Sequence, residues 1–83
     1  MADSGSHKSL FTPAYDRFLV LLRETRANAG LTQKEAAGKM KRPQSFISKC
    51  ESGERRVDVV ELLAFCKAYE ISAEGFVRKL RPR

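Results

Sequence analysis

The stretch Gly30–Gly53, GLTQKEAAGKMKRPQSFISKCESG, decides the fold because it predicts two short helices joined by a tight basic turn. On a helical wheel the second of these helices, over 43–52, has two faces of opposite character. Its apolar face carries Phe46, Ile47 and Cys50, and its polar face carries Gln44, Ser45, Ser48, Lys49 and Ser52. A helix with one apolar face and with amide, hydroxyl and ammonium groups on the opposite face is suited to reading base edges in a DNA major groove. The alternative is an ordinary surface helix with a solvated outer face.

The net charge of +6 over 83 residues is concentrated in two parts of the chain. Residues 34–56 hold seven basic and three acidic side chains, residues 72–83 hold four and one, and residues 57–71 hold one and three. Localised positive charge attracts a polyanion by counterion release, whereas charge that serves solubility alone would be spread evenly. The chain length predicts one small domain with a modest core.

Composition also argues against several classes of protein. No apolar run is long enough to cross a bilayer and no signal-peptide pattern is visible, so we expect a cytoplasmic protein without a membrane partner. Cys50 and Cys66 lie in helical apolar patterns and are expected as buried thiols, and adding His7 does not make a metal site. Because no Ser/His/Asp or phosphate-loop arrangement appears, we expect no enzyme, no cofactor and no small-molecule substrate.

Capping and stop signals place the helix boundaries. Thr12 followed by Pro13 is a helix start, Gly30 is suited to ending that helix, and Thr32 with Glu35 forms a capping box. The Asp58–Glu61 capping box and the Ser72 cap mark two further helix starts. Together these signals predict five helices: one over 13–29, one from Thr32 to the turn at Met40–Arg42, and three over 43–52, 59–69 and 73–80. No segment alternates with period two, which predicts an all-α domain over 12–80, a disordered arm over 1–11 and a basic tail over 81–83.

Apolar residues at helical spacing predict the buried faces. They are Tyr15, Phe18, Leu21, Leu22, Ala29, Ala36, Ala37, Met40, Leu62, Leu63, Phe65, Cys66, Tyr69, Phe76, Val77 and Leu80, with Ile71 as a buried connector. The three apolar residues of the last helix cannot all be buried in so small a domain. An exposed remainder would suit a dimer seam, and the alternative is simple packing on the first and fourth helices.

The ordered set of short motifs resembles the Cro/C1-type, or XRE-type, helix-turn-helix proteins. The motifs are Leu31-Thr32-Gln33, Ala36-Ala37, Ile47-Ser48, Glu51-x-Gly53 and the Arg55/Arg56 pair, within roughly residues 16–77. The resemblance implies a five-helix, lambda-repressor-like domain from a bacterium or phage, with the helix over 43–52 in the major groove. It also implies a homodimer on palindromic double-stranded DNA, with half-sites ~34 Å apart.

The resemblance also implies which side chains contact DNA. Gln44 would read a base, since a carboxamide can pair with N6 and N7 of adenine, and Lys49 would donate to guanine or to a phosphate. Ser45 would be a weaker reader, and Ser48 would face the groove, a phosphate or water. The implied phosphate contacts are Thr32, Gln33, Lys41, Arg42, Ser52, Arg55 and Arg56. For any one of the basic side chains in this set, a solvated charge is the alternative.

Three further positions bear on how the helix over 43–52 is held. Arg26 and Glu51 match an ion pair of the family that sets the tilt of this helix. Lys41 stands where the family often has glycine, so a positive φ there would cost on the order of 1 kcal/mol. Ala36 stands where leucine is common, which predicts a shifted or looser crossing of the two helices.

The function that these patterns favour is a sequence-specific transcription regulator, either a repressor or an autoregulator. The rival is a protein-interaction module, or an antitoxin that uses the same fold to bind a protein partner. The rival predicts that the polar face of the helix over 43–52 tolerates mutation.

Overall fold

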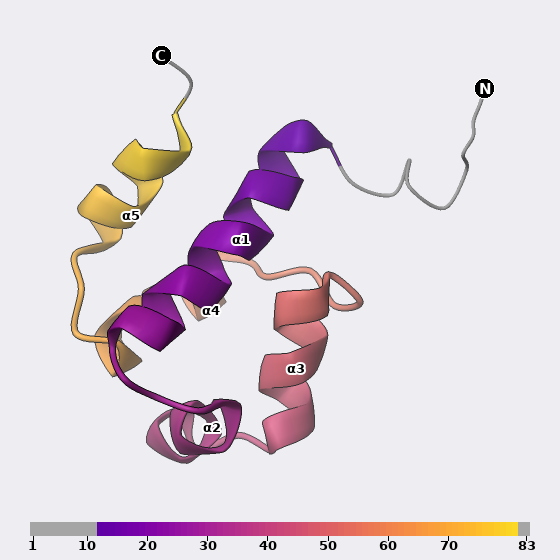
Figure 1. Ribbon diagram of the computed structural model, residues 1–83, viewed down its shortest axis with the longest axis vertical. Helices are drawn as coiled ribbons and strands as arrows, with labels where there is room; N and C mark the ends of the chain where they lie inside the picture. Colours follow the sequence, from indigo (N-terminus) through magenta and orange to yellow (C-terminus); the bar gives the residue numbers. More distant parts are fainter. Residues whose placement is uncertain (1–11, 82–83) are drawn as a thin grey trace.

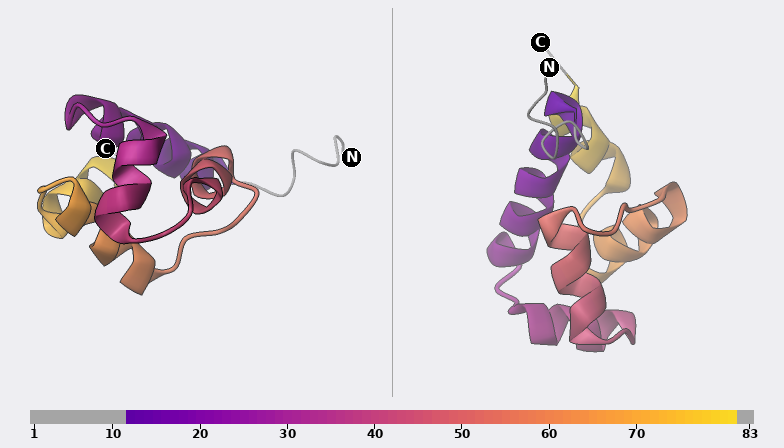
Figure 2. Two further views of the ribbon diagram at one scale, coloured as in Figure 1. Left: turned by 90° about the horizontal axis from the view of Figure 1, so that it is seen from below. Right: turned by 90° about the vertical axis from the view of Figure 1, so that its right-hand side faces the viewer.

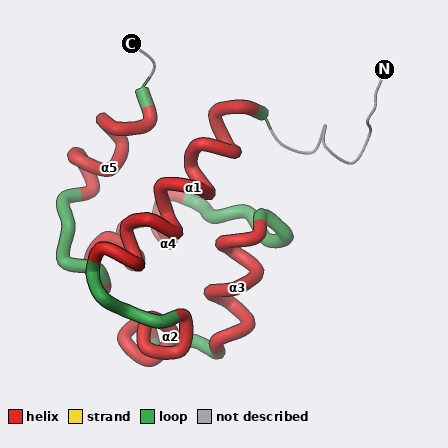
Figure 3. The backbone as a smooth tube through the Cα atoms, in the orientation of Figure 1, coloured by secondary structure: helices red, strands yellow, loops and turns green. Residues whose placement is uncertain are grey.

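The structure, a computed structural model, describes residues 12–81, which form five helices and no strand. The helices are α1 (Pro13–Asn28), α2 (Gln33–Met40), α3 (Gln44–Ser52), α4 (Val59–Ala68) and α5 (Ala73–Leu80). In Figure 1, α1 runs diagonally with α5 on one side and α3 on the other, and Figure 3 shows the short loops that join the helices. The predicted arm over 1–11 and the last two residues of the predicted tail lie outside the described residues.

Side-chain caps account for four of these five helix starts. Thr12, Thr32, Asp58 and Ser72 each accept a hydrogen bond from the backbone N–H three residues later, and the two predicted capping boxes are both present. By contrast, α3 begins after Pro43, which is its N-cap rather than its first residue, and no side chain caps it. Two helices end one residue earlier than predicted, because Ala29 and Tyr69 are C-caps.

The turn between α2 and α3 depends on a left-handed residue that is not glycine. Lys41, the C-cap of α2, has φ 57° and ψ 43°, as its place in the family pattern predicted. Its backbone N–H and that of Arg42 donate to the carbonyls of Gly38 and Ala37. The turn therefore closes with its backbone bonded, while the Lys41 side chain is exposed.

All five helices contribute to one core, around which α1 contacts α3 and α5, and α2 contacts α3 and α4. Its buried members are Phe18, Leu19, Leu22, Ala36, Ala37, Phe46, Ile47, Cys50, Phe65, Cys66, Tyr69 and Phe76. The sequence pattern missed Leu19, which lies on the buried side of α1.

Three residues predicted as buried are exposed instead, namely Ala29, Leu63 and Ile71. Ala29 lies at the end of α1, beyond the last turn that packs on the core. Helix α4 is apolar around most of its circumference, so its periodicity does not tell which apolar residues face inward. Val77 is the exposed apolar remainder that was expected for α5, and Leu63 lies exposed beside it.

Candidate nucleic-acid interface

Helix α3 lies at the edge of the helix bundle and crosses α2 at a steep angle. The left view of Figure 2 shows α2 from its side and α3 nearly end on. Its inner face is buried through Phe46, Ile47, Cys50 and Glu51. Its outer face exposes Gln44, Ser45 and Lys49, with Ser48 half-buried beside them. The structure therefore brings the four predicted base readers together on the outer side of one anchored helix.

The polar groups on this outer face differ in how free they are to bind. The hydroxyls of Ser48 and Ser52 donate to backbone carbonyls three residues earlier, each at 3.2 Å. The side chains of Gln44, Ser45 and Lys49 make no hydrogen bond or ion pair with another described residue. Unpaired amide and ammonium groups on an exposed helix keep their donors available for a ligand.

A buried carboxylate fixes α3 to α1 and α2. Glu51 is 2% exposed, and its Oε2 accepts from Arg26 Nε at 2.6 Å. Its Oε1 accepts from Arg26 Nη2 at 3.1 Å and from Gln33 Nε2 at 3.0 Å. The hydrogen bond to Glu51 raises the pKa of Arg26. Arg23 Nη1 adds a bond to the Glu51 carbonyl oxygen at 2.9 Å, a contact that the sequence did not predict.

The hydrogen bond to Glu51 reduces the number of Gln33 side-chain donors that remain available to bind a DNA phosphate. One N–H of its carboxamide is used by Glu51, and the side chain is half-buried. The Thr32 hydroxyl accepts from the Glu35 backbone N–H, so its oxygen is engaged as the helix cap. Both residues remain at the N-terminus of α2, where backbone N–H groups and the helix dipole favour an anion.

The predicted phosphate-binding arginines lie against aromatic rings. The Arg42 guanidinium is 4.1 Å from the Phe46 ring centroid, and that of Arg55 is 4.9 Å from the same centroid. The Arg56 guanidinium is 4.2 Å from the centroid of Tyr15, whose hydroxyl accepts from the Val57 backbone N–H at 3.1 Å. Stacking of this kind limits the positions that a long side chain can take.

Among these arginines, Arg55 has an internal counter-charge. Its two terminal nitrogens donate to the two carboxylate oxygens of Glu61 at 2.7 and 2.8 Å. This pairing lowers the pKa of Glu61 to about 2, helped by the bond from the Asp58 backbone N–H, and raises the pKa of Arg55. Glu61 was predicted only as part of a capping box, so its second role as the partner of Arg55 was missed.

Three further features of the described residues concern metal binding, thiol chemistry and membranes. Residues 12–81 contain no group of three or more His, Cys, Asp or Glu side chains placed to hold a metal ion. Cys50 and Cys66 are buried free thiols, and burial raises the pKa of each. No helix within the same range has the length and apolar character needed to span a bilayer.

Comparisons with known proteins give the family. The helix-turn-helix domain family matches residues 17–76. The solved structure of an XRE-family like protein from Pseudomonas syringae pv. tomato str. DC3000 is 43% identical, with a TM-score of 0.79, over 90% of this chain and 94% of that chain. No curated protein matches. The chain therefore belongs to the XRE-type helix-turn-helix proteins, a family of DNA-binding regulators.

Proposed function

We propose that this protein is a sequence-specific transcription regulator, a repressor or autoregulator, that reads the DNA major groove with α3. The observation that carries the proposal is the division of α3 into an inner face fixed through Glu51 and an outer face with unpartnered Gln44, Ser45 and Lys49. A rigid helix that presents free donors is suited to base readout. The rival, a module that binds only protein, predicts instead that this outer face tolerates mutation.

Gln44 is the proposed main reader, because it lies at the start of α3 and is exposed. Lys49 lies on the same face for a guanine or a phosphate, and Ser45 and Ser48 supply weaker contacts. The proposed phosphate contacts are the backbone and side chains at Thr32, Gln33, Lys41, Arg42, Ser52, Arg55 and Arg56. Arg42 and Arg56 are the strongest of these, since each is stacked on a ring and neither has a carboxylate partner among the described residues.

The apolar face of α4 and α5 supports the proposal of a homodimer. Val59, Val60, Leu63 and Val77 are 74, 75, 53 and 45% exposed. Glu74 and Arg78 lie around the hollow that Leu63 and Val77 line. In an isologous dimer each Glu74 can face the partner's Arg78, so the charges around this face complement themselves. We propose that two copies join here on a palindromic operator.

The experiment that tests base reading starts by selecting bound sites from a random duplex pool. Anisotropy titrations then compare Gln44→Ala with the unchanged protein. We expect Gln44→Ala to weaken the selected site by roughly 1–3 kcal/mol and to relax preference at one base pair. Glu54→Gln, on an exposed residue beyond α3, is the control that should keep the preference. Failure to enrich any sequence, or equal loss on random DNA, would refute the assignment.

The dimer is tested separately by sedimentation at several concentrations. Leu63→Glu should shift the protein to monomer and weaken binding to the two-half-site duplex, while leaving binding to one half-site unchanged. A chain that sediments as a monomer even on the full operator would refute the seam.

A further inference from the structure

The Arg55 side chain joins the proposed DNA interface to the first turn of α4. Its backbone N–H donates to the Lys49 carbonyl oxygen at 3.1 Å, which folds the loop after α3 back onto that helix. Its guanidinium lies over the Phe46 ring of α3 and donates through both terminal nitrogens to Glu61 of α4. Arg55 Nη1 also donates to the Arg56 carbonyl oxygen at 3.1 Å. The guanidinium is therefore fixed in place in the protein without DNA.

The two N–H groups that hold Glu61 are the same fork that an arginine offers to a phosphate. Carboxylate and phosphate oxygens both accept two parallel bonds from a guanidinium, and one fork cannot hold both anions. The side chain of Arg55 is 43% exposed, so a phosphate can approach it, whereas Glu61 is packed more closely at 13%. Arg55 therefore meets DNA with an anion already bound.

Glu61 stays ionised at neutral pH. The bonds from Arg55 and from the Asp58 backbone N–H lower the pKa of this carboxyl to about 2, helped by the nearby charge of Arg42. The Asp58 bond, at 3.0 Å, and the N-terminus of α4 still stabilise the carboxylate when Arg55 turns away. Exchange of Glu61 for a phosphate on Arg55 therefore leaves no buried charge without a partner.

We propose that Glu61 competes with DNA phosphates for Arg55, and that it thereby lowers the affinity of this chain for any duplex. This competition rests on the proposed function, because it takes the α3 side of the molecule as the surface that meets DNA. Phosphate contacts carry no sequence information. Glu61 therefore weakens sequence-independent binding and leaves base reading by α3 untouched, so a larger share of the affinity depends on sequence.

The test is a double-mutant cycle at positions 55 and 61, measured by anisotropy on a random-sequence duplex at several salt concentrations. In the unchanged chain, Arg55→Ala should weaken binding only about twofold, because Arg55 exchanges one anion for another. In the Glu61→Gln background the same change should weaken binding about sixfold and lower the slope of log affinity against log salt by about one unit. Glu61→Gln alone should strengthen binding about fourfold.

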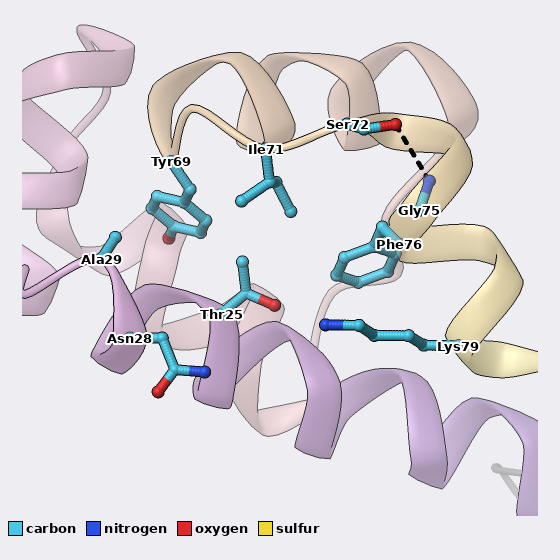
Figure 4. A pocket seen from close by; sticks show the side chains of 9 residues that line it. All are labelled: Thr25, Asn28, Ala29, Tyr69, Ile71, Ser72, Gly75, Phe76 and Lys79. Atoms are coloured by element: carbon cyan, nitrogen blue, oxygen red, sulfur yellow. Dashed lines mark hydrogen bonds between the residues drawn. The ribbon is translucent and has the colours of Figure 1, made fainter.

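Two control variants make the same changes in charge away from this pair. Glu54→Gln removes a neighbouring exposed carboxylate that bonds no described residue, and it should strengthen binding only about 1.5-fold. Lys79→Ala removes an exposed cation beside the hollow between α1 and α5 (Figure 4), and its small cost should be equal in both Glu61 backgrounds. Glu61→Asp keeps the charge but shortens the reach to Arg55. It should strengthen binding about twofold, and it replaces Glu61→Gln if that variant folds poorly.

An equal cost of Arg55→Ala in the two backgrounds overturns the competition, as does a gain from Glu61→Gln no larger than that from Glu54→Gln. Either result leaves the proposed function standing, because base reading is tested by the sequences enriched from the random pool. Coupling between the two positions with no enriched sequence supports the competition and refutes sequence-specific reading. A chain that binds no duplex at about 50 mM salt overturns both.

Discussion

Replacing Glu51 with glutamine should destabilise the domain by about 3 kcal/mol. The carboxylate is 2% exposed and accepts three side-chain hydrogen bonds, two from Arg26 and one from Gln33. A carboxamide of the same size turns one acceptor oxygen into an NH₂ group that faces a donor, and it removes the counter-charge of Arg26. Breaking a buried ion pair costs roughly 3–5 kcal/mol, and the 18% exposure of the Arg26 side chain favours the lower end.

The assay is urea unfolding followed by circular dichroism at pH 7, with a thermal melt beside it. For a domain of this size a loss of that order lowers the melting temperature by roughly 10–25 °C. Glu54→Gln is the matched control, because Glu54 is exposed and its side chain makes no bond to another described residue. We expect this control to stay within about 0.5 kcal/mol of the unchanged protein.

A double variant separates the ion pair from general damage to the core. Replacing Arg26 and Glu51 together with methionine removes both charges, so it should recover most of the stability that Glu51→Gln loses. If the free energy of unfolding of Glu51→Gln lies within about 1 kcal/mol of that of the Glu54→Gln control, the network does not hold α3 as we argue.

Three further outcomes are expected. Lys41→Gly should raise the free energy of unfolding by about 0.5–1 kcal/mol in urea, because glycine adopts φ 57° without strain. The control Lys39→Gly, within α2, should lower it, and a Lys41→Gly variant that is less stable than the unchanged protein would contradict strain at Lys41. The pKa of Glu61 in the folded state lies below its ordinary value, so its contribution to stability is present above about pH 4.5 and is lost as the pH falls toward 2. Glu61→Gln should therefore make stability depend less on pH in that window, and an unchanged acid-unfolding profile would refute the stabilising role of the Arg55–Glu61 pair. Arg56→Ala should lower the slope of log affinity against log salt by about one unit in DNA titrations, and an equal slope would remove Arg56 from the phosphate contacts.

The sequence predicted those parts of the fold that depend on local chemistry. The Thr12, Thr32, Asp58 and Ser72 caps act on backbone groups three residues away, so their positions could be read from short spacings. The left-handed Lys41 followed from a turn that lacks its usual glycine. The second left-handed residue that is not glycine, Glu70, was not expected, because no motif marks the connection between α4 and α5.

Contacts between distant segments could not be predicted in the same way. The bond from Gln33 to Glu51 and the pairing of Arg55 with Glu61 depend on how the helices pack. The apolar periodicity of α4 also did not show which of its faces is buried, because a helix that is apolar on several sides can turn any of them toward the core. For this reason Leu63 was expected with the core and lies exposed. The roles of the α3 side chains in binding DNA remain predictions.

The position of Phe46 connects one of the proposed phosphate contacts to the interior of the domain. Its ring is 7% exposed and stacks on Phe65 at 5.9 Å between centroids, while Arg42 lies over the same ring. A substitution that merely repacks the interior at this site also moves Arg42, a cation that we propose contacts the sugar–phosphate backbone. Under that proposal, heat stability and affinity for DNA cannot be changed independently at this residue, and related chains that vary it should change both traits together.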